Sequence, residues 1–221
     1  MELFESHFNT LTGNLCYDND AYEMFANKGI KKHVNYLTFK ALFEQMTKMK
    51  EPIILETGIA SFGTNSTYLF NEYVRKYGGR FWSVDINKAL VDAHKGNMCP
   101  ATELVCDDSV HFLKEWSTQN KVADVIYLDS YDLDFYNYEP SANHGLMEFK
   151  VIQPVIKENT LLLIDDTPIN PYWIDSRDKL YYDMIDFYDK NHFMPGKGMY
   201  VLNEVKNATI LLHNYQVLYT F

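Results

Sequence analysis

The chain has 221 residues, of which 47% are hydrophobic and 23% charged, which is typical of a globular protein with a sizeable core. Its formal net charge of −10 at pH 7 makes a nucleic acid an unfavourable partner. No apolar run approaches membrane-spanning length, no signal-peptide pattern is present, and the three cysteines form no disulfide or metal pattern. We therefore predict a cytoplasmic protein without membrane or nucleic-acid partners.

Glycines and apolar runs predict strands and helices that alternate along most of the chain. Residues 1–34 are aromatic and weakly periodic, and we expect them to form a helical cap over the core. Apolar runs predict strands over residues 52–57, 80–84, 101–106, 123–128, 160–164, 208–212 and 216–219. Helical periodicity predicts helices over residues 35–50, 64–77, 87–95, 110–116, 143–157 and 180–188. Residues 199–205 fit either a helix or a strand.

Five strand–helix units followed by two adjacent strands are typical of an α/β protein whose parallel sheet is covered on both faces. We therefore predict a Rossmann-like, doubly wound, mostly parallel seven-stranded sheet that ends in an antiparallel hairpin. Residues 35–221 contain no repeat, linker or low-complexity segment, so we assign them to one domain, preceded by the cap of residues 1–34.

The first strand leads into a glycine-containing turn and then into a predicted helix N-terminus. Gly58 and Gly63 have the spacing G-x-x-x-x-G, which matches neither the dinucleotide fingerprint nor a phosphate-binding P-loop. Glu56, at the strand end, would repel a phosphate but accept an ammonium, so it favours a cationic ligand such as S-adenosylmethionine (SAM). A tight turn with a solvated glutamate is the alternative interpretation.

Acidic residues follow all five predicted parallel strands, at the edge where open α/β sheets bind their ligands. Asp85, after the second strand, could accept both hydroxyls of a ribose. Asp107 or Asp108, together with Ser109, follows the third strand and could bind an adenine amino group. A single acid in such a place is commonly a helix cap, but five consecutive ones favour a binding site.

These motifs resemble those of class I SAM-dependent methyltransferases, most of all the cephalosporin-hydroxylase-like and macrocin-type sugar O-methyltransferase groups. The first motif of those groups resembles E-x-G-x-x-x-G-G-S, and Glu56, Gly58 and Gly63 match it, with Thr64 in the serine place. Phe62 replaces one of its glycines. Their third-strand G-D-S pattern appears here as Asp107-Asp108-Ser109. The resemblance covers residues 35–221 and implies that these residues and Asp85 bind SAM.

The resemblance also implies a magnesium site at the ends of the fourth and fifth strands. Asp129, Asp165 and Asp166 stand where such enzymes place their metal-binding acids. Carboxylate oxygens are the ligands that Mg²⁺ prefers, and a substrate hydroxyl bound to the ion becomes more acidic. The alternative is that Asp165 and Asp166 only cap the turn that follows.

A histidine is the candidate catalytic base. His144 has Glu148 four residues on, on the same helix face, and the related families have a similar segment there. With Ser141 and Asn143 as caps, we expect His144 in the first turn of its helix, where opposing charges leave the sign of its pKa shift open. Tyr131 and Asp132 compete with it for the role of base.

The resemblance implies a SAM-dependent, Mg²⁺-assisted O-methyltransferase that acts on a hydroxyl group of a small molecule or sugar. A catalytically silent SAM-fold binding or assembly subunit and a hydroxylase-like relative are the alternatives. We expect residues 1–34 and 130–142 to determine the acceptor, and homo-oligomerisation is left open.

Overall fold

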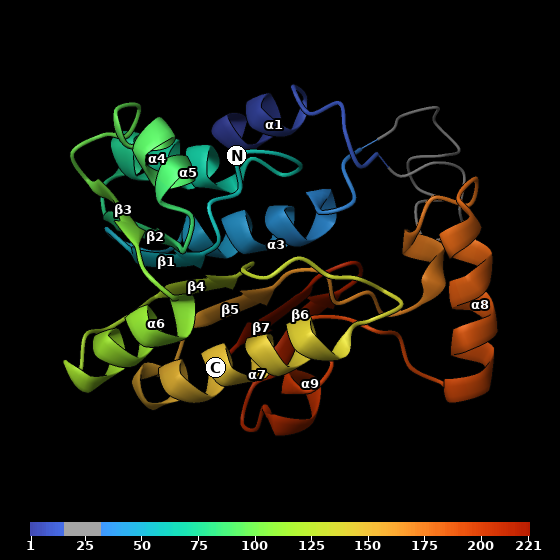
Figure 1. Cartoon of the computed structure of the whole chain (residues 1–221). Coiled ribbons are helices and arrows are strands. Elements are labelled where there is room, and N and C mark those ends of the chain that lie inside the picture. The colour runs from blue at the N-terminus through green and yellow to red at the C-terminus, as the bar shows by residue number, and fades with distance from the viewer. Residues whose placement is uncertain (16–31) are drawn as a thin grey trace.

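In the computed structural model, which describes residues 1–15 and 32–221, a single seven-stranded sheet lies at the centre (Figure 1). The strands are β1 (Ile53–Thr57), β2 (Arg80–Asp85), β3 (Thr102–Cys106), β4 (Val125–Leu128), β5 (Leu161–Ile164), β6 (Thr209–His213) and β7 (Val217–Thr220). They lie in the order β3-β2-β1-β4-β5-β7-β6. Pairs from β3 to β5 are parallel, whereas β7 is antiparallel to both β5 and β6. The predicted α/β sheet with its C-terminal antiparallel hairpin is therefore confirmed.

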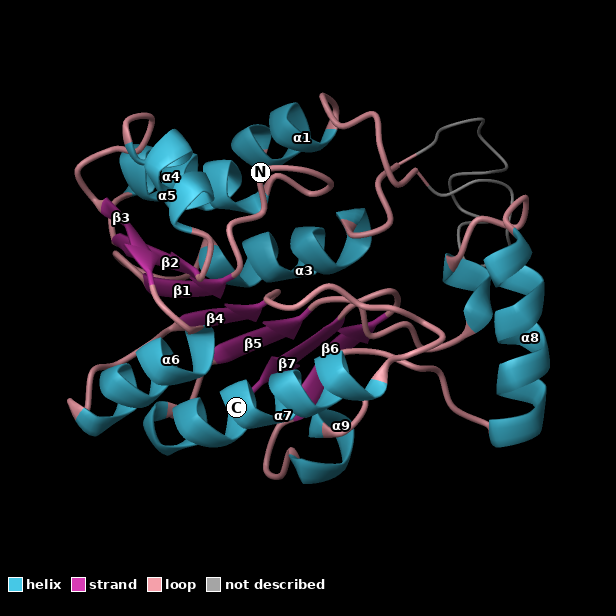
Figure 2. Ribbon diagram, in the orientation of Figure 1, coloured by secondary structure: helices cyan, strands magenta, loops and turns pink. Residues whose placement is uncertain are grey.

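Helices cover both faces of the sheet (Figure 2). The elements are α1 (Glu2–Phe8), α3 (Tyr36–Met46), α4 (Ser66–Tyr77), α5 (Lys88–Lys95), α6 (Ser109–Thr118), α7 (Glu139–Ile152), η2 (Gln153–Val155), η3 (Pro171–Trp173), α8 (Lys179–Asn191) and α9 (Val201–Glu204). Figure 2 shows α1, α3, α4 and α5 on one face and α6, α7 and α9 on the other. In the described residues no helix is both long and apolar enough to cross a membrane.

Alternating side chains of the central strands supply the cores of both layers. Val125 and Tyr127 of β4 point into the core that contains Phe39 of α3, whereas Ile126 and Leu128 belong to the opposite core. Successive side chains of a strand point to opposite faces, so a continuous apolar run marks a strand that is covered on both sides. This is why the apolar runs located the strands correctly.

The N-terminal helix α1 is part of the first core. Phe4 and Phe8 are buried and pack against Tyr36, with ring centroids 5.2 and 5.5 Å away respectively. The predicted cap of residues 1–34 also includes residues 16–31, which lie outside the described residues.

Helix α7 begins earlier than predicted, at Glu139 instead of 143. Pro140 lies in its first turn, where the missing N–H and the fixed φ of proline are compatible with a helix. Ser141 donates to the Tyr138 carbonyl at 3.0 Å from inside the helix, so the prediction that it caps the N-terminus was wrong. His144 therefore lies in the second turn of α7. The ambiguous segment 199–205 contains the short helix α9.

Candidate functional site

The site lies at the carboxyl ends of the parallel strands, where the strand order reverses. After β1 the chain builds outward through β2 and β3 and then returns to place β4 on the other side of β1. The crevice between such diverging connections is where open α/β sheets bind ligands. A cavity of about 1160 Å³ opens there, and its lining includes Gly58, Asp85, Asp108, Asp129 and His144.

The loop after β1 lines one part of the cavity and needs its glycines. Gly58 has a φ of +82°, and a Cβ there would lie 2.6 Å from the Asp129 carbonyl oxygen. Gly63 has a φ of +59°, which also favours glycine. Gly58, Gly63 and Thr64 all line the cavity, as expected for a cofactor loop.

Glu56 does not reach the cavity. Its side chain is fully buried, and its carboxylate accepts hydrogen bonds of 2.6 Å from the hydroxyls of Ser66, Thr67 and Ser83. Burial outweighs these bonds and raises the pKa of Glu56 to about 7. The residue therefore connects β1 to β2 and to the start of α4, and its side chain does not face the cavity in which a cationic ligand was expected.

The acids after β2 and β3 differ in position. Asp85 lines the cavity, and its carboxylate accepts hydrogen bonds from the backbone N–H groups of Ile59 and Asn87 at 3.0 and 2.7 Å. Asp108 and Ser109 also line the cavity at the start of α6. Asp107 lies outside the cavity lining, and its Oδ2 is 2.7 Å from Nδ1 of His111. Asp108 is thus the member of the predicted pair that lines the cavity.

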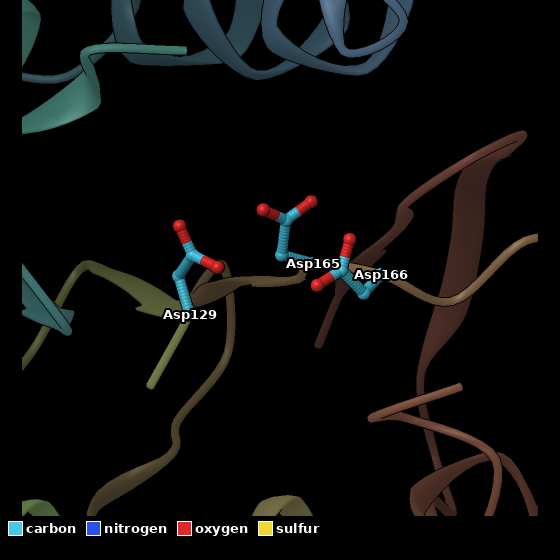
Figure 3. A group of neighbouring side chains, drawn as sticks. All are labelled: Asp129, Asp165 and Asp166. Carbon is cyan, nitrogen blue, oxygen red and sulfur yellow. The ribbon is translucent and has the colours of Figure 1, made fainter. Parts of the chain in front are cut away.

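The three predicted metal-binding acids do converge. Figure 3 shows Asp129, Asp165 and Asp166 grouped where the chain leaves β4 and β5. One carboxylate oxygen from each lies within 4.8 Å of the others. We call these three residues the acid cluster.

A lysine for which the sequence suggested no role lies in contact with this cluster. The Nζ atom of Lys197 is 2.8 Å from Asp129 Oδ1 and 3.2 Å from Asp166 Oδ2. Only 4% of its side chain is exposed. The sequence offers no local signal for this role, because Lys197 lies far along the chain from both acids and between two glycines that suggest a turn.

Burial and mutual charge set the protonation of the cluster. Burial and the Asp165 carboxylate raise the pKa of Asp129 well above its usual range. Burial acts in the same direction on Asp165, but Lys197 and hydrogen bonds outweigh it and lower the pKa of Asp165. For Lys197, attraction to the three carboxylates outweighs burial, so its pKa is raised well above its usual value and the amine is charged at neutral pH.

The acid cluster fits Mg²⁺ in its ligand type but not in its surroundings. Carboxylate oxygens are the hard ligands that this ion prefers. The Lys197 ammonium, however, already shares Asp129 and Asp166, and an ion on the same carboxylates would meet a fixed like charge. Mg²⁺ therefore fits only if Lys197 leaves the cluster.

His144 lines the cavity beside a buried carboxylate. Its Nε2 is 2.9 Å from Ser109 Oγ and 3.6 Å from Glu148 Oε1. Ser130 donates to the same Glu148 oxygen at 2.6 Å. The interaction with Glu148 outweighs burial and raises the pKa of His144. The direction of the pKa shift of His144, which the sequence left open, is therefore upward.

The two competing candidates for the base are more exposed. Tyr131 and Asp132 both line the cavity on the segment after β4. The Tyr131 side chain is 54% exposed, and its ring centroid lies 5.4 Å from that of His144. All three candidates therefore surround one part of the cavity, and His144 is the one with a buried carboxylate partner.

Asn35, which precedes α3, connects the glycine loop to the acid cluster, and no sequence pattern singled it out. Its Nδ2 donates to Thr64 Oγ1 at 2.7 Å and to Asp165 Oδ1 at 3.3 Å. The lining also includes the apolar side chains of Phe135, Trp173, Ile174 and Leu180, together with the charged residues Asp175 and Arg177. This part of the cavity therefore offers both apolar and charged groups to a ligand.

Comparison with known proteins supports the fold and no narrower assignment. No protein-family model matches the chain, and no curated protein matches its sequence. Solved structures do resemble it. The methyltransferase MycE of the mycinamycin biosynthetic pathway, solved with Mg and SAH, superposes with a TM-score of 0.52 at 14% identity, over 85% of this chain and 49% of MycE.

Two further structures are similar at lower scores. The Podospora anserina methyltransferase PaMTH1, solved with SAH, has a TM-score of 0.49 and 16% identity over 83% of this chain and 76% of its own. The CurJ carbon methyltransferase has a TM-score of 0.49 and 14% identity over 83% and 52%. This chain spans about half the length of MycE.

This chain has the fold of the class I SAM-dependent methyltransferases.

Proposed function

We propose that this chain transfers a methyl group from SAM to a hydroxyl group of a small molecule or sugar. The observation that supports this most is the single cavity at the switch point of the sheet. It joins the glycine loop and Asp85 on one side to His144 and the acid cluster on the other. Its volume of about 1160 Å³ exceeds that of a pocket for one drug-sized ligand, roughly 300–1,000 Å³. A cofactor and an acceptor can therefore be held together.

The cofactor end of the cavity has the groups that a nucleoside requires. Asp85 projects from the end of β2 and can accept hydrogen bonds from ribose hydroxyls. Asp108 and Ser109 follow β3 and line the cavity, where we expect the adenine ring of the cofactor to lie. Gly58 and Gly63 let the remainder of the ligand approach the backbone.

Methyl transfer also requires an orienting site and a proton acceptor. SAM, when bound, supplies an electrophilic methyl group, and transfer to a hydroxyl oxygen leaves SAH and releases the hydroxyl proton. The imidazole of His144 is the group we assign to accept that proton, in its neutral form. Glu148, beside Nε2, then stabilises the resulting imidazolium. Mg²⁺ assistance would require Lys197 to leave the acid cluster, so no step of this proposal depends on a metal.

Calorimetric titration with SAM and SAH tests the cofactor. We expect both to bind, and Asp85→Ala to weaken binding by about 1.5–3 kcal/mol, or roughly 10- to 150-fold, because a charge-assisted contact is lost. Asp92→Ala is the matched control, because Asp92 is an exposed acid on α5 outside the cavity lining. Binding of NAD in place of SAM and SAH would refute the proposal. SAM binding without SAH formation against a panel of hydroxylated acceptors would favour a silent binding subunit.

A further inference from the structure

We propose that the ammonium of Lys197 is the permanent cation of the acid cluster, so that the chain binds no divalent metal ion there. The inference concerns ion binding by Asp129, Asp165 and Asp166, and it is independent of the methyl transfer proposed above. Its first support is that Lys197 has no free donor. Besides the contacts to Asp129 Oδ1 and Asp166 Oδ2, Nζ donates to the Asp129 carbonyl oxygen at 3.3 Å.

The backbone of Lys197 is fixed by contacts with the loop after β5. Its N–H donates to the Asp166 carbonyl at 2.9 Å, and the Gly198 N–H donates to Thr167 Oγ1 at 3.0 Å. A Cβ on Gly198 would lie 2.6 Å from that same Thr167 oxygen. Because this loop also contains Asp166, the lysine and its carboxylate partner are held together by the backbone as well as by charge.

Helix α7 closes the other side of the lysine. A Cβ on Gly145 would lie 2.6 Å from the Lys197 carbonyl oxygen, and a Cβ on Gly196 would lie 2.6 Å from the Asp166 carbonyl oxygen. Both glycines therefore permit close packing that any side chain would prevent. This packing holds the backbone of Lys197 in place on both sides, so its side chain extends from a fixed position beside the acid cluster.

The remaining carboxylate oxygens also lie within reach of protein donors, with the single hydroxyl proton of Tyr127 shared between two of them. Tyr127 Oη lies 3.1 Å from Asp129 Oδ2 and 2.9 Å from Asp165 Oδ2. Asp165 Oδ1 accepts from Gln216 at 2.7 Å, and Asp166 Oδ1 accepts from Tyr215 at 2.9 Å. Together with the two contacts of Lys197, all six oxygens of the acid cluster have a donor or cation within hydrogen-bond reach. An ion that requires ligands at about 2.0–2.1 Å in an octahedron would have to displace several of these groups.

Mn²⁺ is the probe, because it prefers the same oxygen ligands as Mg²⁺ and is detected directly by electron paramagnetic resonance. We expect no stoichiometric Mn²⁺ binding to the full-length wild type without SAM. Lys197→Met should bind one Mn²⁺ at least about 100-fold more tightly, because a like charge has left the site. Lys190→Met, which removes an exposed lysine on α8, is the control and should behave as the wild type.

Lys197→Met could fail to fold because its three carboxylates would have no compensating cation. A second variant keeps the test usable in that event. Asp129→Asn combined with Lys197→Met keeps two carboxylates and an amide oxygen as ligands. Its formal charge equals that of three carboxylates with one ammonium, and it should also gain Mn²⁺ binding. The Tm of each lysine variant should rise with Mn²⁺, whereas that of the wild type should be the same in Mn²⁺ and EDTA.

Two results would overturn the inference. One is stoichiometric Mn²⁺ binding by the wild type that Asp166→Asn abolishes. The other is a folded lysine variant that gains no Mn²⁺ binding, since the lysine would then not be what excludes the ion. SAM and SAH titrations of the same samples report separately on the proposed methyltransferase function, so failure of one proposal is distinguishable from failure of the other.

Discussion

The raised pKa of His144 is due mainly to one residue, Glu148. The carboxylate is buried beside Nε2, and this contact outweighs the burial that would lower the pKa of the imidazole. A base must be neutral to accept a proton, so a raised pKa means that methyl transfer should increase with pH through a value above 6.5. The same shift affects stability. It favours the folded state fully below the unfolded-state pKa, and that contribution is lost as pH rises through the folded-state value.

Glu148→Gln should lower the pKa of His144, because the residue that raises it has lost its charge. NMR titration of the His144 ring protons in wild type and variant measures this without a known acceptor. Glu158→Gln removes an exposed acid on the loop after η2 and should leave the titration unchanged. An equal or higher His144 pKa in Glu148→Gln would contradict the assignment of Glu148 as the residue that raises it.

At the scale of elements, the hydrophobic pattern of the sequence predicted those strands and helices that neighbouring residues along the chain determine. The runs that became β4 and β5 are apolar at every position because helices cover both faces of the sheet. The start of α7 was misplaced because Ser141 and Asn143 looked like caps, whereas Pro140 is equally suited to a first turn. Glu56 was assigned to the ligand because the sequence shows that a strand ends there but not that three hydroxyls surround its carboxylate.

Gly58→Ala tests the junction between β1 and β4. The variant would place a Cβ 2.6 Å from a backbone oxygen and force a non-glycine residue to a φ of +82°. We expect a loss of more than about 1 kcal/mol in the free energy of unfolding and weaker SAH binding. Gly96→Ala is the matched control, since Gly96 has a φ of −67° and nothing within 4 Å of an added Cβ. Urea denaturation and calorimetry measure both effects, and equal stability of the two variants would contradict the expected strain.

At the scale of the whole molecule, the site is assembled from segments that no local pattern connects. Asn35 from α3, Lys197 from the segment before α9 and Gln216 from the start of β7 all contact the acid cluster. The parallel-sheet pattern brought the strand-end acids together in the prediction, because all the parallel strands end at one edge. The partners of those acids depend on how the helical layer and the C-terminal hairpin pack, which is set by tertiary contacts and not by periodicity.

The N-terminal helix is the clearest case of such packing. The Phe4 side chain is fully buried, and its ring lies 4.7 Å from that of Phe8 and 5.6 Å from that of Phe43. The same helix contacts the site, since Nε2 of His7 is 2.8 Å from the Thr64 carbonyl oxygen on the glycine loop. Helix α1 should therefore stabilise the domain and not merely border an acceptor.

Phe4→Ala should lower the free energy of unfolding by about 3–5 kcal/mol, because it removes a large buried ring and leaves a cavity between α1 and α3. Ser6→Ala, on the exposed side of the same helix, should change it by no more than about 0.5 kcal/mol. Urea denaturation of the full chain measures both. If α1 were a detachable cap, Phe4→Ala would leave the main unfolding transition at the wild-type urea concentration. A single transition shifted to lower urea would instead show that α1 and the sheet unfold as one unit.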